Sequence, residues 1–66
     1  MIDVNALRGK IAEQGTSQVK VAEYIGITPK TFYIKMSKGI FGSDEIDKMI
    51  DYLHIENPVE IFLQKK

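Results

Sequence analysis

The sequence predicts an all-α fold, a compact bundle of five short helices in a single domain that spans residues 1–66. Two observations lead to this prediction. Apolar residues recur at spacings of three and four, the spacing that places side chains on one face of an α-helix. Capping residues, glycines and prolines stand at the ends of the apolar segments, where helices begin and end. The 66 residues, 44% of them hydrophobic and 27% charged, suit an ordered domain with a small core.

The first helix is predicted over residues 2–14, with Asp3 as its N-cap. Leu7 and Ile11 lie four residues apart and form its inward face. Gly15 follows and ends the helix.

The second helix begins after Ser17, whose hydroxyl can accept a hydrogen bond from an early unpaired backbone N–H. Val21, Ala22 and Ile25 then share one face at helical spacing. Gly26 ends the helix, because glycine adopts the left-handed conformation common at helix ends without steric cost.

The third helix begins almost at once, with Thr28 as N-cap and Pro29 at the first helical position. Phe32 and Met36, four residues apart, form its inward face. Two short helices joined by a tight glycine turn form a helix-turn-helix unit, whose second helix can enter the major groove of DNA.

A fourth helix is predicted from a cap at Ser43. Its apolar stripe consists of Ile46, Met49, Ile50 and Leu53. A last short helix begins with Asn57 as cap and Pro58 at the first helical position. In the loop between the third and fourth helices, Ile40 and Phe41 are expected to fill the core, with contact of one of them with a partner subunit as the alternative.

The charges are divided unevenly along the chain, although the formal net charge is zero. Residues 1–42 carry six basic and three acidic side chains, a net charge of +3, and residues 43–66 carry the reverse, −3. The positive half contains the helix-turn-helix unit, which favours an interaction with an anionic partner such as DNA.

The sequence contains no pattern typical of an enzyme, a metal-binding protein or a membrane protein. No nucleophile, acid–base or phosphate-loop arrangement is recognisable, so we expect no enzyme, no catalytic residues and no cofactor or small-molecule ligand. With no cysteine and one histidine, no metal site is expected. The sequence contains no apolar run long enough to cross a bilayer and no signal-peptide pattern, so we expect no membrane association and a cytoplasmic location.

The central stretch resembles the helix-turn-helix of Cro and CI-type phage repressors, the broad XRE-like family. The matching residues are Gln18, Val21, Ala22, Ile25, Gly26, Ile27, Thr28 and Phe32. The similarity extends to residues 7–11 and 44–55 and so covers most of the chain. It implies a lambda-repressor-like DNA-binding domain that acts as a small transcriptional regulator, a repressor of phage or prophage type. Lys35 and His54 depart from the pattern, standing where an apolar residue and a glycine are usual.

The resemblance also implies which residues would touch a double-stranded DNA operator. The early, outward residues of the second helix of the unit would meet base edges, and flanking residues would hold phosphates. The expected base contacts are Thr28, Pro29, Lys30, Thr31, Tyr33 and Ile34; the expected phosphate contacts are Ser17, Gln18, Lys35 and Lys38.

A weak homodimer that forms on DNA is expected, because one helix reads too few base pairs to select a site. The surplus of apolar residues near the C-terminus suggests the contact. The expected interface residues are Ile40, Phe41, Val59, Phe62 and Leu63. The alternative is a protein-binding module on the same scaffold that modulates another repressor, favoured by the zero net charge and the apolar pair Tyr33 and Ile34.

Overall fold

The structure is a computed structural model that describes residues 2–62. All regular secondary structure in this part of the chain is helical, which confirms the predicted all-α bundle. The five helices are α1 (Val4–Glu13), α2 (Gln18–Ile25), α3 (Pro29–Lys38), α4 (Ser43–Leu53) and α5 (Pro58–Phe62). Helix α1 is shorter than predicted, because residues 2 and 3 form an extended entry rather than helical turns.

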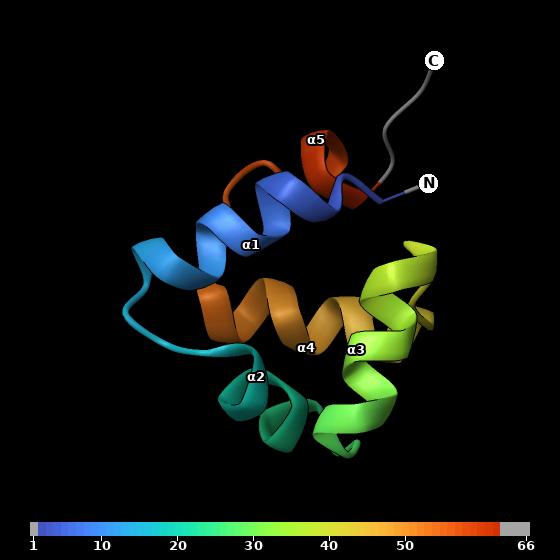
Figure 1. Ribbon diagram of the computed structural model, residues 1–66. Helices are drawn as coiled ribbons and strands as arrows, with labels where there is room; N and C mark the ends of the chain where they lie inside the picture. Colours follow the sequence, from blue (N-terminus) through green and yellow to red (C-terminus); the bar gives the residue numbers. More distant parts are fainter. Residues whose placement is uncertain (1, 63–66) are drawn as a thin grey trace.

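The helices are arranged around α4, which crosses the middle of the molecule (Figure 1). In that view α1 and α5 lie above α4, α2 lies below it, and α3 stands across its N-terminal end. Helix α2 packs against both α3 and α4, while α1 packs against α2 and α5. A backbone hydrogen bond of 2.8 Å from the Asp3 N–H to the Ile61 carbonyl ties the start of the chain to α5.

The core consists of the apolar faces that the helical spacing predicts. Phe32, Leu7, Met36, Met49, Leu53 and Val21 are fully buried. Ala22 is fully buried as well, with an exposed fraction of 0%. Among residues 2–62, no polar or charged residue is buried.

The loop between α3 and α4 differs from the prediction at one of its two apolar residues. Phe41 is buried, and its ring centroid lies 5.3 Å from that of Phe32. Ile40 is 67% exposed, so the expectation that it fills the core was wrong. The Ile40 N–H donates to the Lys35 carbonyl at 3.2 Å, and this bond closes the end of α3. Ile40 therefore belongs to the helix end, and the next residue, Phe41, fills the core.

The helix starts follow the predicted capping, with one correction. The side chains of Asp3, Ser17 and Thr28 each accept a hydrogen bond from the backbone N–H three residues on. The N-cap of α4 is Gly42 and not Ser43, which is already the first helical residue. The Glu45 carboxylate explains the shift, because it reaches back to accept the Gly42 N–H at 2.8 Å, one half of a capping box.

The helix ends use a left-handed residue, as the glycine positions predict. His54, after α4, adopts the same conformation with φ 53°, and it is the only non-glycine residue with positive φ between residues 2 and 62. The Ile55 N–H then bonds the Ile50 carbonyl at 3.0 Å, which closes the helix end. A histidine thus occupies a position whose geometry favours glycine.

Candidate nucleic-acid interface

A turn of three residues, 26–28, joins α2 to α3. The backbone N–H groups of Gly26 and Ile27 both bond the Ala22 carbonyl, each at 3.0 Å. Gly26 adopts φ 88°, and nothing would lie within 4 Å of an added Cβ there, so its backbone conformation alone calls for glycine. Thr28 then caps α3, and Pro29 is its first residue. These bonds fix how α3 leaves α2 and therefore which of its side chains point outward.

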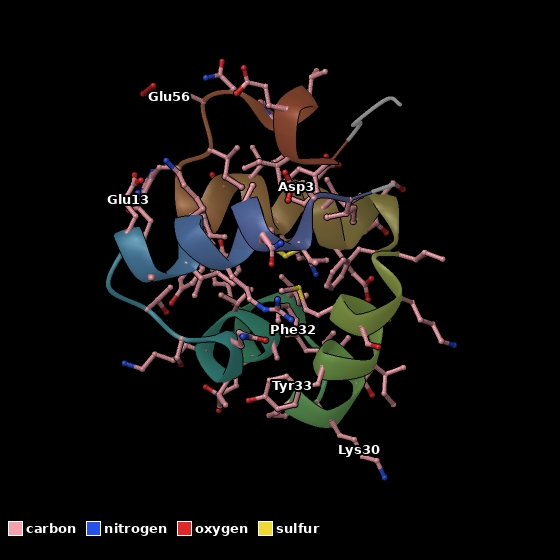
Figure 2. The ribbon with its side chains drawn as sticks, turned by 45° about the horizontal axis from the view of Figure 1, so that its top comes forward. Asp3, Glu13, Lys30, Phe32, Tyr33 and Glu56 are labelled. Carbon is pink, nitrogen blue, oxygen red and sulfur yellow. The ribbon has the colours of Figure 1, made fainter. Side chains whose placement is uncertain are left out.

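The outward face of α3 contains Lys30, Tyr33, Ile34, Ser37 and Lys38, all exposed. Tyr33 is 49% and Ile34 47% exposed, which is high for neighbouring apolar side chains in so small a molecule. Figure 2 shows Lys30 pointing away from the body of the molecule, and Phe32 lies towards the interior. Lys30, Ile34 and Lys38 are spaced four apart, so they follow one line along the helix.

Thr28 and Thr31 are hydrogen-bonded to each other at the start of α3. The Thr28 hydroxyl accepts the Thr31 N–H at 3.2 Å and donates to the Thr31 hydroxyl oxygen at 2.9 Å. The Thr31 hydroxyl keeps its own proton available to a further acceptor. Both threonines therefore hold the first turn of α3, and Thr31 retains a donor beside Lys30.

The N-terminus of α2 carries two of the expected phosphate contacts. The Ser17 side chain accepts the Lys20 N–H at 3.2 Å and keeps its hydroxyl proton, while Gln18 is half-buried as the first helical residue. Lys20 is exposed and has no ion-pair partner among the described residues. Lys20 lies in the first turn of α2 and so belongs to this region, although it was not among the expected contacts.

Lys35 has a partner that the sequence analysis did not foresee. Its ammonium group lies 2.7 Å from both carboxylate oxygens of Glu45, across the loop from α3 to α4. Its expected role as a phosphate contact stays a prediction, and the ion pair with Glu45 competes with that role. Partial burial alone would raise the pKa of Glu45, but the Lys35 ammonium and the Gly42 N–H outweigh burial and lower it from its usual value.

The expected dimer residues fall into two groups. Ile40 is 67% and Val59 61% exposed, whereas Phe41 and Phe62 are buried and their assignment to an interface is corrected. Both phenyl rings are buried in the core of the chain, which leaves little of their surface to contact a partner. Leu63 lies outside the described residues. Val59 lines a hollow of about 260 Å³ together with Ile46, Asp47, Ile50, Pro58 and Phe62.

A cluster of polar contacts between α2 and α4 was not predicted. The rings of Tyr24 and Tyr52 are stacked, with centroids 4.5 Å apart. The Tyr24 hydroxyl donates to Asp51 at 3.1 Å, and the hydroxyls of Thr16 and Tyr52 lie 3.1 Å apart. The hydrogen bond to Asp51 and its negative charge raise the pKa of Tyr24. Nothing in the sequence pairs residues 28 positions apart, so this cluster had no sequence signal.

Residues 2–62 contain no group of three or more histidine, aspartate or glutamate side chains placed to hold a metal ion. Within the same range, each helix is too short or too polar to cross a bilayer. Comparisons with protein-family models, with curated proteins and with solved structures find no match for this chain. The likeness to Cro and CI-type repressors therefore stands on the residues of the sequence alone.

Proposed function

We propose that this protein binds double-stranded DNA in a sequence-specific manner as a small transcriptional regulator, with α2 and α3 acting as a helix-turn-helix and α3 in the major groove. The observation that carries the proposal is the outward face of α3. It combines a lysine that projects from the molecule with two exposed apolar side chains, on a helix fixed by the tight turn after α2.

Base readout would come from the first two turns of α3. The Lys30 ammonium suits the O6 and N7 acceptors of guanine, and the Ile34 side chain suits the methyl group of thymine. The Thr31 hydroxyl can donate to a base acceptor, since its proton is not used within the helix cap. Thr28 and Pro29 stand at the start of the same turn, and Tyr33 would lie against a sugar.

Phosphate contacts would flank this readout. Ser17 and Gln18 stand at the N-terminus of α2, where unpaired N–H groups and the helix dipole favour an anion. Lys38 lies at the other end of the outward face of α3, and Lys20 is a further candidate. Lys35 was expected in this set as well, but its ion pair with Glu45 competes with a phosphate contact.

Two copies of the chain would bind one operator, since a single α3 reaches only a few base pairs. Their half-sites would lie about 34 Å apart, one turn of duplex. Ile40 and Val59 remain as the expected contact, because both are exposed apolar residues. A contact through so few apolar residues suits a weak dimer that forms on DNA.

The second candidate function is binding to another protein, such as a repressor. The exposed pair Tyr33 and Ile34 and the neutralised Lys35 favour it. The two functions differ in their response to salt. Affinity for DNA falls steeply as salt rises because counterions are released, whereas an apolar protein interface is far less sensitive.

Selection of bound sequences from random duplexes, followed by binding measurements on the selected site, tests the proposal. Lys30→Ala is expected to relax specificity at one base pair, at a cost of about 1–3 kcal/mol there. Lys38→Ala is expected to weaken binding to every sequence alike and to lower the salt slope by about one. Lys48→Ala, an exposed lysine on α4, serves as the control. Equal loss of affinity on all sequences for Lys30→Ala would contradict the assigned base contact.

A further inference from the structure

The Lys35–Glu45 pair is one of two ion pairs between side chains within residues 2–62. The other, Lys10–Glu13, lies within one helix and leaves Glu13 largely in solvent. In contrast, the Lys35–Glu45 pair joins α3 to α4, and the exposed fractions of its side chains are only 32% and 15%. Partial shielding from water makes this pair stronger than an ordinary surface contact.

Glu45 is held by more than Lys35. One of its oxygens accepts the Gly42 N–H at 2.8 Å, and the carboxylate lies in the first turn of α4, where the positive end of the helix favours it. The positive charge of Lys48, on the next turn of α4, also favours the ionised form. The carboxylate is therefore a fixed negative charge beside α3 at neutral pH.

Helix α3 carries three lysines and no acidic residue of its own. Lys30 and Lys38 lie on its outward face without an ion-pair partner among the described residues, while Lys35 is neutralised by Glu45. A lysine that contacts phosphate adds affinity for every sequence and carries no sequence information. Neutralising one of three lysines thus removes affinity that does not discriminate between sites.

We infer that Glu45 is a positioning residue that withholds Lys35 from the phosphate backbone and so lowers both the affinity for DNA of every sequence and the dependence of that affinity on salt. This inference rests on the proposed function. A residue on α4, outside the α2–α3 unit, would thus set how tightly the unit binds DNA of any sequence.

Glu45→Gln tests the inference, since glutamine keeps the size of the side chain and an oxygen to accept the Gly42 N–H but removes the charge. Binding to the selected duplex and to an unrelated duplex is measured between 50 and 200 mM salt. Releasing one lysine to phosphate should steepen the slope of log affinity against log salt by about 0.9, an additional loss of about threefold to fourfold across that range. At low salt the affinity for both duplexes should rise, and the ratio of the two affinities should stay the same.

Two controls separate this effect from a general change in charge. Asp44→Asn removes an equal charge from an exposed neighbour in the same turn of α4 and should leave the slope unchanged. The double variant Lys35→Met with Glu45→Gln removes both charges of the pair, so that neither is left unpaired in the folded chain. It should restore the wild-type slope.

An unchanged slope in Glu45→Gln, or an equal change in Asp44→Asn, would overturn the inference while leaving the proposed function standing. If the wild-type chain binds no duplex at low salt, the proposed function fails and the inference fails with it. The two failures are therefore distinguishable in one set of titrations.

Discussion

His54 offers a direct test of how the helix ends stabilise this small domain. A non-glycine residue in the left-handed region costs about 1–2 kcal/mol, and His54 stands there with φ 53° and ψ 50°. Its imidazole is exposed and makes no hydrogen bond or ion pair with another described residue, so removing the ring loses little. Replacement by glycine removes this strain, but it also raises the entropy of the unfolded chain, which destabilises the fold by about 0.5–1 kcal/mol. His54→Gly should therefore stabilise the fold by about 0.5–1 kcal/mol.

The assay is thermal and urea unfolding followed by circular dichroism. For a domain of this length the expected gain corresponds to a rise in Tm of about 2–8 °C. His54→Ala should be close to neutral, because it removes the ring but keeps the backbone conformation. Gly26→Ala should destabilise by about 1–2 kcal/mol through strain alone, since space for the methyl group is open. If His54→Gly were neutral while Gly26→Ala destabilised, the strain assigned to His54 would be refuted.

Three further predictions concern packing, assembly and pH. Ala22→Leu should cost about 1–3 kcal/mol because Ala22 is fully buried and a larger side chain would overpack the core, and an unchanged melting temperature would refute tight packing at this position. Val59→Lys should reduce the two-to-one complex with a palindromic duplex in sedimentation, whereas a one-to-one wild-type complex at saturation would contradict the dimer. Because the pKa of Glu45 is lowered on folding, its stabilising contribution is complete above its unfolded pKa of about 4.5 and is lost as the pH falls through the lower folded value. The urea midpoint should therefore fall less between about pH 6 and pH 3 in Lys35→Met than in the wild type, and an equal fall in both would contradict the pairing.

The fold was predictable because the local signals agree with one another. Ser17, Thr28 and Gly26 mark helix starts and ends by their own backbone chemistry, and the structure places all three where that chemistry indicates. Phe32 and Met36 were assigned to the interior by spacing alone, and both are buried. The wrong predictions concern neighbouring residues that suit the same position. Gly42 and Ser43 can both serve as the N-cap of α4, and Ile40 and Phe41 can both fill the core from the loop.

The candidate interface was predictable only in part, because spacing gives the face of a helix but not its partners. The resemblance to the repressor family assigned Tyr33 and Ile34 to the outward face, and both are exposed. The partner of Lys35 does not follow, since Glu45 reaches it only after the loop has turned α4 against α3. The buried state of Phe62 was missed for a related reason: the number of apolar side chains that a small core absorbs depends on how the helices pack.

The stacking of Tyr24 on Tyr52 separates the three tyrosines of the chain into two spectroscopic environments. The chain has three tyrosines and no tryptophan, so its near-ultraviolet absorption and emission come chiefly from these phenol rings. Tyr24 and Tyr52 form one stacked pair between α2 and α4, whereas Tyr33 lies on the outward face of α3, in edge contact with Phe32 and with no other tyrosine. With Tyr24 and Tyr52 replaced by phenylalanine, the remaining emission would come from Tyr33 and would report whatever occupies that face. The wild-type pair, in turn, gives a spectroscopic signal for the packing of α2 on α4, without any attached label.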